Sequence, residues 1–478
     1  MLHPDRLFPP DREVRRLARG IYEQTRDLPI VSPHGHLDPA GLATDAPIDD
    51  PATELVTKDH YLLRMAYSQV VPLEALGVRP LDGRGRSPEV DGRQVWRTFA
   101  EQYRLFLGTP SKLWFDHTLG AVFGVEARFG PDTADAVYDE VCARLAEDAF
   151  RPRALYERFG IEFLATTDGA LSSLGAHAAI RASGWSGVVV PTFRPDDVVD
   201  PDGPRFADNL DRLGELTGED TTTWAGYLAA LRSRRAVFRA AGATASDHGH
   251  PTARTADLPR AEAEALFGRL LGGRRDPGDA ELFRAQLLTE MAAMSLDDGL
   301  VLQLHVGSWR EHNPTQRDRY GIGLGADIPT TVDFVGGLKP LLDRFGNEPR
   351  LTVVVSTLDE STYSRELAPM AGHYPALRLG PPWWFHDSPE GIRRFRRRTT
   401  ETAGFANTVG FNDDARSLLT IPARHDVARR LDAGFLAELV AEHRMEEDEA
   451  VAVAVDLAHG LARSAFRVDG GSSRGSSR

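Results

Sequence analysis

Short apolar runs alternate with longer amphipathic stretches along most of this chain of 478 residues. The run at 28–31 (LPIV) has the length and the β-branched content of a buried strand, and the stretch at 11–26 has the apolar spacing of a helix. From about residue 158 onward, further apolar runs follow one another, separated by spacers long enough for a helix. These runs lie at 163–167, 188–193, 243–246, 300–306, 351–356, 376–379 and 408–411.

Strands that alternate with helices predict an α/β fold with a parallel sheet, and about eight strands favour closure into a (β/α)8 TIM barrel. An open doubly wound sheet is the alternative, but no glycine-rich phosphate loop follows the first strand. The region from 38 to about 150 carries helical patterns and no convincing strand. We therefore expect a distorted barrel with a helical insertion after its first strand.

These patterns divide the chain into four segments. The N-terminal helix and the first strand occupy 1–37, the helical insertion 38–155, and the remainder of the barrel 156–467. The tail at 468–478 has the composition of a linker, so we expect it to be disordered. The basic run at 391–404 is typical of a solvated helix face.

Charge and cysteine content narrow the class of protein. A formal charge of −14 argues against nucleic acid or an anionic membrane as a partner, so an anionic substrate would need arginines grouped in a cleft. The single cysteine, Cys142, excludes an internal disulfide and fits a reducing cytoplasm. The N-terminus lacks an apolar signal core and no run of about 18 apolar residues occurs, so we expect a soluble, cytoplasmic protein.

The first predicted strand leads directly into His34-Gly35-His36. Side chains two residues apart on an extended segment point the same way, so both imidazoles can face one small volume. Two neutral imidazoles at this spacing are half of a divalent-metal site. A lone His-Gly-His is a common tripeptide, and its position at the end of a strand is what favours a ligand pair.

The last predicted strand ends beside Asp413 and Asp414. In a closed barrel the first and last strands are neighbours, so one aspartate can complete the ligand set and leave open positions for water or substrate. Adjacent aspartates after a strand also serve as helix caps. We expect Asp413 to cap or support and Asp414 to bind the metal.

Further polar residues follow other predicted strands. His305 lies inside an apolar strand, where a histidine is more often a core residue, but Arg310 comes soon after it. Arg194 and Arg416 also lie near strand ends, and three guanidinium groups at one rim are suited to a carboxylated substrate. The aromatic loop at 383–385 either packs in the core or forms a wall against a sugar face.

Taken in order, the motifs of this chain resemble those of the uronate isomerases of the amidohydrolase superfamily. The motifs are LPIVSPHGHLDP, TKDHYLLR, FLATTDGALSSLGAHAAI, VVPTFRPD, SDHG, LQLHVGSWREHN, GPPWWFHDSPEG and NDDARS, and they span about 20–430. The resemblance implies a distorted barrel with a helical insertion. It also implies reversible conversion of D-glucuronate to D-fructuronate and of D-galacturonate to D-tagaturonate.

The resemblance also implies roles for individual residues. His34, His36 and Asp414 look like the ligands of a metal ion, usually zinc in this family, with His305 beside it. His60 and Tyr61 would reach over the site from the insertion. A homo-oligomer is implied as well. The residues that would line the substrate are Arg194, His305, Arg310, Arg416 and Trp384.

The chain departs from the family in two places. After His305 it reads VGSWREHN, without the several asparagines that are common there, which affects the expected preference among uronates. At 413–417 it reads DDARS, where members often have T-D-S-R-S. Neither departure removes a proposed ligand.

An aldose–ketose isomerisation through an enediol needs a group that moves a proton between C2 and C1. Asp414, His60 and Tyr61 are the three candidates, and Arg416 is expected to stabilise the enediolate oxygens together with the metal. A metal-dependent hydrolase or deaminase that activates water at the same ligands is the alternative function. A sugar-acid binding protein without activity would have lost a ligand, and none is missing.

Overall fold

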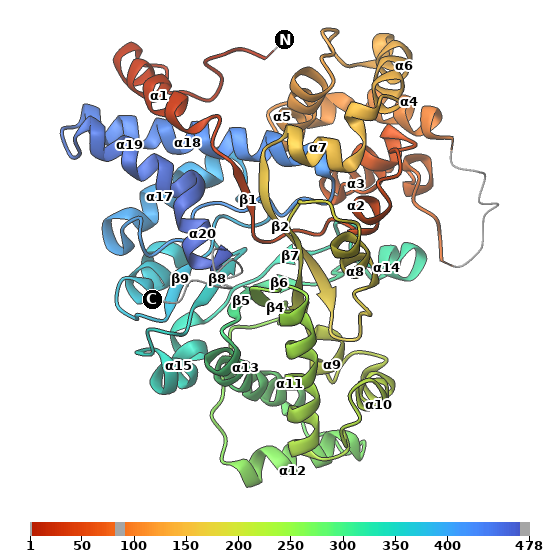
Figure 1. Cartoon of the computed structure of the whole chain (residues 1–478), viewed down its shortest axis with the longest axis vertical. Coiled ribbons are helices and arrows are strands. Elements are labelled where there is room, and N and C mark those ends of the chain that lie inside the picture. Colours follow the sequence, from red (N-terminus) through yellow and green to blue (C-terminus); the bar gives the residue numbers. More distant parts are fainter. Residues whose placement is uncertain (1, 82–90, 469–478) are drawn as a thin grey trace.

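The computed structural model describes residues 2–81 and 91–468. Residues 469–478, most of the predicted disordered tail, lie outside the described residues. The fold is α/β, with a parallel sheet of seven strands in the middle of the molecule and helices around it (Figure 1). This confirms the predicted class and the parallel sheet.

The strands of this sheet follow one another in space in the order in which they occur along the chain. Each neighbouring pair is parallel. A doubly wound sheet reverses its strand order at a switch point, and this sheet does not. The strands are β1 (Ile30–Ser32), β2 (Ile161–Gly169), β3 (Val189–Arg194), β4 (Ala245–His248), β5 (Val301–Val306), β8 (Val353–Thr357) and β9 (Leu377–Leu379).

The predicted strand at 408–411 is reduced to a single bridge in the structure. Thr408 pairs in parallel with Leu379 of β9, and no longer ladder forms there among the described residues. Gly410 has a φ of +76°, in the left-handed region, and such a residue ends an extended run. The apolar run therefore lies at the edge of the sheet as an irregular segment.

The described residues between β1 and β2 form helices and turns and contain no strand. Figure 1 shows these helices gathered beside the two strands. Their apolar side chains, such as Trp96 and Phe99, share one core with Ile30 and Ile161 of the strands. The helices are α2 (Ala40–Thr44), α3 (His60–Tyr67), α4 (Gly92–Gln102), α5 (Pro110–His117), α6 (Ala134–Leu145) and α7 (Pro152–Arg158).

The other helices cover the remaining strands and the N-terminal end. The first of them, α1 (Arg12–Thr25), packs Leu17 and Ile21 against Leu436 of a long C-terminal helix. The others are α8 (Gly175–Ala182), α9 (Asp196–Val199), α10 (Phe206–Thr217), α11 (Trp224–Ala240), α12 (Arg260–Leu271), α13 (Asp279–Asp298), α14 (Pro314–Tyr320), α15 (Phe334–Phe345), α16 (Ala368–Ala371), α17 (Pro389–Ala403), α18 (Ile421–Ala441), α19 (Glu447–Val455) and α20 (Leu461–Ala465).

A second, two-stranded sheet lies in the loop after β5, where no strand was predicted. Its antiparallel strands are β6 (Ser308–Trp309) and β7 (Ile328–Pro329). Strands of two residues are too short to leave an alternating pattern in the sequence. This small sheet holds the loop that carries Arg310 beside the end of β5.

The basic run on α17 does not form a fully solvated helix face, so that prediction is wrong for part of it. Arg396 is only 3% exposed. Its Nε and Nη2 donate to the two carboxylate oxygens of Asp432 on α18 at 2.7 and 2.9 Å. A buried guanidinium needs such a bidentate partner, and the helical spacing places this one arginine on the inner face.

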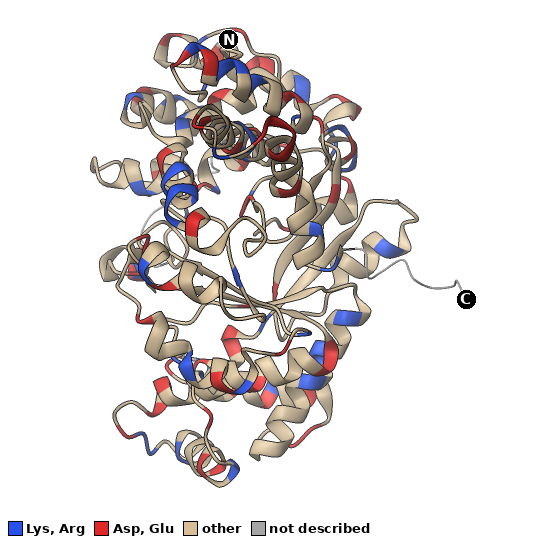
Figure 2. Ribbon diagram, turned by 90° about the vertical axis from the view of Figure 1, so that its left-hand side faces the viewer, with Lys and Arg blue, Asp and Glu red and all other residues tan. Residues whose placement is uncertain are grey.

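Charged side chains lie mainly on the outer helices and loops, while the strands in the middle of the molecule carry few of them (Figure 2). The strands are buried on both faces, as in β5, where every residue is buried. Among the helices that the structure describes, none combines the length and the apolarity that crossing a membrane requires. The polar residues at the ends of the strands therefore stand out against an apolar interior.

Candidate metal and substrate site

Two segments far apart in the sequence meet at the carboxyl end of β1. The amide of His36 donates a hydrogen bond to the carbonyl of Ala415 at 2.8 Å, and a Cβ on Gly35 would lie 3.3 Å from that carbonyl oxygen. Glycine between the two histidines permits this close approach. Asp414 has a φ of +47°, and such backbone strain is typical of functional segments. The contact places Asp414 opposite the two imidazoles.

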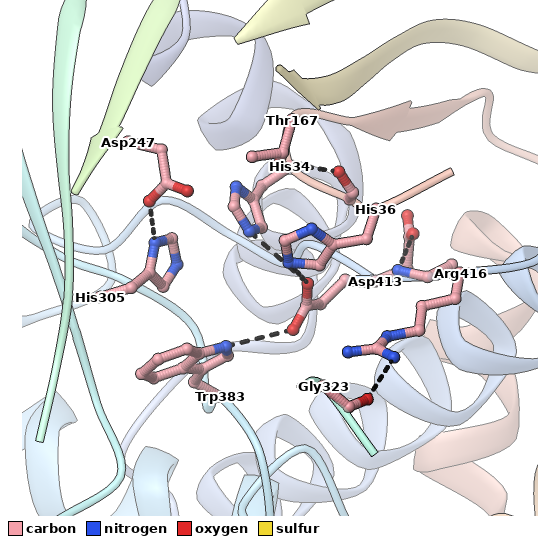
Figure 3. A network of polar contacts seen from close by, with 12 residues as sticks. His34, His36, Thr167, Asp247, His305, Gly323, Trp383, Asp413 and Arg416 are labelled. Atoms are coloured by element: carbon pink, nitrogen blue, oxygen red, sulfur yellow. Dashed lines mark hydrogen bonds and ion pairs between the residues drawn. The ribbon is translucent and has the colours of Figure 1, made fainter. Parts of the chain in front are cut away.

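The imidazoles of His34 and His36 lie side by side in Figure 3, and Asp414 completes one group with them. The Nε2 atoms of His34 and His36 lie 3.5 and 3.4 Å from Asp414 Oδ1, and the three side chains are 2%, 27% and 7% exposed. Burial lowers the pKa of both histidines, that of His36 to about 3. Burial opposes the charge of Asp414, but His36 and His34 outweigh it and hold the pKa of this carboxyl at about 2.

This donor set fits a divalent metal ion. Two neutral imidazoles and one ionised carboxylate offer ligand atoms that all lie within 4.8 Å of one another. Asp414 Oδ1 is buried and has no hydrogen-bond partner among the described residues. A buried anionic oxygen without a donor costs free energy unless a cation takes its place. The three residues could therefore hold one cation and leave positions open for other ligands.

A second chain of contacts links His34 to the ends of β3, β4 and β5. The ring of His305 lies 4.4 Å from that of His34, centroid to centroid, and its Nδ1 is 2.5 Å from Asp247 Oδ1. Arg194 Nη1 lies 3.2 Å from the other oxygen of Asp247. Burial alone would raise the pKa of Asp247, but Arg194 and His305 hold it well below its usual range. His305 is thus part of a buried polar network, and not an isolated core histidine.

Sequence reasoning did not select Asp247 as a site residue. The signal was present, because Asp247 follows a predicted strand in the same way as the other selected residues. The run at 243–246 is short and weakly apolar, so the strand signal before Asp247 is weaker than at the other sites. Its 0% side-chain exposure and its two charged partners show that it belongs to the site.

An aromatic wall covers one side of the group. Trp383 Nε1 donates to Asp414 Oδ2 at 3.1 Å (Figure 3), and its ring lies 4.8 Å from that of His305. Trp383 stacks on Trp384 at 5.1 Å, and the ring of Trp384 lies 5.0 Å from that of His60. Both tryptophans are buried, so the loop packs and at the same time faces the polar group. The two interpretations of this aromatic loop are therefore compatible.

Tyr61 and His60 come from the start of α3 and reach this wall. Tyr61 Oη donates to Asp387 Oδ1 at 2.8 Å, and Arg424 Nη1 donates to the other oxygen of Asp387 at 3.0 Å. Burial and the charge of Asp387 raise the pKa of Tyr61 well above 10. Burial also raises the pKa of Asp387, to about 6, against the opposing effect of Arg424. Asp387 and Arg424 carry no strand-end signal, and only the fold brings them to Tyr61.

The three arginines predicted to form a clamp have different partners. Arg416 Nη1 donates to the carbonyl of Gly323 at 3.0 Å, and burial lowers the pKa of its guanidinium (Figure 3). Arg310 pairs with Asp327 at 3.0 Å and its guanidinium lies 5.0 Å from the Trp384 ring. These two face the site from the β6–β7 side. Arg194 lies within the network of the strand ends, where it pairs with Asp196 and Asp247.

A small cavity of about 20 Å³ adjoins the group. That volume is about the space of a single water molecule. A wider hollow of about 1140 Å³ lies between the loop at 252–257 and α15, and none of the predicted site residues lines it. We place the candidate reaction site at the small cavity, because Asp414 and the charged side chains around it line this cavity. Its lining includes Lys58, Asp59, His60, Asp414, Arg416 and Arg424.

A family model and curated relatives match nearly the whole length of the chain. Residues 13–466 match the family model described as glucuronate isomerase. A uronate isomerase of Rhizorhabdus wittichii is 60% identical over 467 residues, which cover 98% of this chain and 98% of that protein.

Solved structures agree with this result. The glucuronate isomerase of Caulobacter crescentus has a TM-score of 0.96 at 56% identity, over 98% of this chain and 97% of that one. The uronate isomerase of Thermotoga maritima has a TM-score of 0.90 at 25% identity, over 98% and 99% of the two chains.

Proposed function

The chain belongs to the glucuronate isomerase family, and we propose that the residues around His34, His36 and Asp414 carry out its reaction. That reaction is the aldose–ketose isomerisation of hexuronates, D-glucuronate to D-fructuronate and D-galacturonate to D-tagaturonate. The observation that supports this placement is the convergence of two neutral imidazoles and one ionised carboxylate beside the small cavity that His60, Asp414 and Arg416 line.

We assign the metal site to His34, His36 and Asp414, with zinc as the ion. Imidazole nitrogens and one carboxylate oxygen are ligands typical of zinc, and a three-residue set leaves an open position, as catalytic sites require. When bound, such a cation polarises the oxygens of a substrate and stabilises the negative charge that develops on them. Trp383 orients Asp414 through its other oxygen, and His305 packs against His34.

Three side chains are placed to move the proton between C2 and C1. Asp414 is ionised, and His60 Nε2 is buried without a hydrogen-bond partner among the described residues. Burial and the charge of Arg416 keep the pKa of His60 far below 6.5, so its imidazole is a neutral acceptor. Tyr61 holds its proton toward Asp387, which favours a role as hydrogen-bonding partner or acid. We keep all three in the proposed proton path.

Guanidinium groups bind the anionic parts of the substrate. Arg416 lies beside Asp414 along the cavity wall and is suited to the enediolate oxygens. Arg194 and Arg310 are assigned to the C6 carboxylate, because a guanidinium fork matches a carboxylate in two hydrogen bonds. Trp384 would pack against the sugar and keep water out. The small cavity of about 20 Å³ implies that side chains around it move to admit a hexuronate.

The fold that holds these residues is, in our proposal, a distorted (β/α)8 barrel with 38–155 as a helical insertion. The bridge at Thr408 and the bond from the His36 amide to Ala415 support this proposal, because both lie where the eighth strand would close onto β1. We also propose that the protein is a cytoplasmic homo-oligomer, as the resemblance and the single cysteine suggest.

Incubation of the purified chain with D-glucuronate, and separately with D-galacturonate, tests the proposed site. We expect ketose to form with both sugars, to stop after treatment with a chelator and to return when zinc is added. Exchange of the C2 proton with deuterated water is then measured in the variants Asp414→Asn, His60→Asn and Tyr61→Phe. The variant that loses this exchange identifies the residue that moves the proton. Ketose formation that withstands complete removal of metal would contradict the metal assignment.

A further inference from the structure

The chain contains a second His-Gly-His, at the end of β4. His248 is the last residue of β4 and His250 lies two residues further on, so both imidazoles leave the sheet on one short segment. Asp196 begins α9, directly after the neighbouring strand β3. The ligand atoms that these three side chains offer all lie within 4.8 Å of one another. None of the three takes part in the reaction proposed above.

Both imidazoles are buried and have a nitrogen without a partner. His248 is 1% exposed and His250 is 6% exposed. His248 Nδ1 and His250 Nε2 have no hydrogen-bond partner in the part of the chain that the structure describes, while His248 Nε2 contacts Ser246 Oγ at 3.3 Å. Burial lowers the pKa of both, that of His248 to about 3, so each ring is neutral near pH 7. Neutral buried imidazoles with a free lone pair are the form in which histidine binds metal.

Asp196 is held in place beside them with an oxygen to spare. Its Oδ2 accepts from Arg194 Nε at 2.8 Å, and the Gly249 amide lies 3.2 Å from each carboxylate oxygen. A Cβ on Gly249 would come within 2.4 Å of the Arg194 guanidinium, so glycine between the two histidines permits this packing. Apart from that amide, Oδ1 has no recorded donor and keeps a lone pair for another partner.

The surrounding charges favour a cation. Arg194 pairs with Asp196 and, through Nη1, with Asp247 at 3.2 Å, so two carboxylates face one guanidinium. These two carboxylates outnumber the guanidinium by one. Asp247 is fully buried and Asp196 is 31% exposed, so an added positive charge is attracted there more strongly than in bulk water.

We propose that Asp196, His248 and His250 form a second metal site, which binds a zinc-like divalent cation separately from His34, His36 and Asp414. Two imidazole nitrogens and one carboxylate oxygen select zinc-type ions over calcium or magnesium, which prefer oxygen ligands. A cation there joins the ends of β3 and β4 and stabilises the carboxylate that holds Arg194. Its role is structural, since its ligands contact neither the small cavity nor the aromatic wall.

Zinc content of the purified full chain tests this proposal. The protein is stripped with a chelator, reloaded with excess zinc, freed of unbound metal by gel filtration and measured by elemental analysis. We expect two zinc ions per wild-type chain, one in the double variant His34→Asn/His36→Asn, and none when His250→Asn is added. The double variant also removes the overlapping cluster of His34, Asp247 and His305, so its remaining zinc reports the second site.

Two further variants guard against loss of folding and non-specific binding. Asp196→Asn affects a half-buried residue and is expected to lower zinc content by one ion while circular dichroism stays that of the wild type. His443→Asn changes an exposed histidine with a φ of +57°, a conformation that asparagine tolerates, and should keep both ions. Absence of zinc from the double variant His34→Asn/His36→Asn, or an unchanged zinc content in His250→Asn, would overturn the proposal.

Discussion

The two His-Gly-His segments, at 34–36 and 248–250, have the same residues and lie in different surroundings. In both, glycine permits another group to approach closely and the low pKa keeps the imidazoles neutral. The first segment receives its carboxylate from Asp414, far along the chain, and the second from Asp196 after the adjacent strand. The tripeptide alone therefore does not distinguish a reaction site from a structural one.

The difference lies in what else faces each segment. The first is bordered by a cavity, by two tryptophans and by Arg416, so a substrate could meet the ligands. Beside the second segment, Arg194 forms ion pairs with Asp196 and with Asp247. Asp247 lies between the two regions, since it contacts His305 with one oxygen and Arg194 with the other. It offers a physical connection from one region to the other.

The largest expected effect comes from removing a ligand of the first segment. His34→Asn should lower kcat/KM by about 1000-fold, because the charge stabilisation that a bound cation supplies is several kcal/mol. Ketose formation and zinc content are measured on the same sample, with His443→Asn as the matched control. Full activity at reduced zinc content would mean that the first segment is the structural one.

The buried carboxyl group of Asp387, near the first segment, should make the stability of the protein depend on pH. Burial raises the pKa of Asp387 to about 6, whereas an aspartate in an unfolded chain titrates near 3.9. Between these values the Asp387 carboxyl binds more protons in the folded than in the unfolded chain, so its own contribution to the free energy of unfolding should fall by about 3 kcal/mol as pH rises from about 4 to 6.

Denaturant unfolding of the wild type and of Asp387→Asn, over that pH range, checks this prediction. The advantage of the wild type over the variant should shrink as the pH rises. A difference between the two proteins that is constant with pH would show that Asp387 is ionised throughout and that burial does not control it.

A smaller effect is expected from the arginine beside the first segment. Arg416→Lys keeps the positive charge and loses the planar fork, so kcat/KM should fall about 30-fold, or about 2 kcal/mol, with zinc content unchanged. Arg444→Lys, at an exposed surface position, is the control. Normal turnover in Arg416→Lys would remove this residue from the proposed substrate contacts.

The smallest effect concerns the two glycines. A methyl group on Gly249 would overlap the Arg194 guanidinium at 2.4 Å, while one on Gly35 would lie 3.3 Å from the Ala415 carbonyl. Gly249→Ala should therefore cost about 1.5 kcal/mol of unfolding free energy and Gly35→Ala about 1 kcal/mol. Thermal and denaturant unfolding measure both, and the reverse order would mean that the Arg194 side chain yields more readily than the backbone.

The class of fold and the positions of the strands could be predicted from the sequence, because apolar runs of strand length are a local property. All seven strands of the large sheet overlap predicted runs. The eighth run failed, since Gly410 turns the chain out of the extended conformation although its neighbours are apolar. The two-residue strands β6 and β7 were missed because so short a pairing leaves no periodic pattern.

Some residues of the candidate site could likewise be predicted from the sequence, and others could not. Local order along the chain was enough to select His34, His36 and Asp414, because each follows a predicted strand and parallel strands end at one rim. Asp387 and Arg424 follow no strand, and they reach Tyr61 only because α3, the aromatic loop and α18 pack together. Arg396 is buried for the same kind of reason: its run is basic, and only the position of Asp432 on α18 shows which arginine points inward.

Sequence by itself thus determined the residue types, the strands that carry them and the order of those strands. Tertiary structure alone decided that the carboxylate beside one His-Gly-His lines a cavity, whereas the carboxylate beside the other pairs with Arg194. The physical reason is that the local pattern of apolar and polar residues shows which side chains are buried and on which face of a strand or helix they lie. The partner of a buried charge, in contrast, is set by long-range packing. A carboxylate some 380 positions away contacts the first pair because the chain closes on itself there.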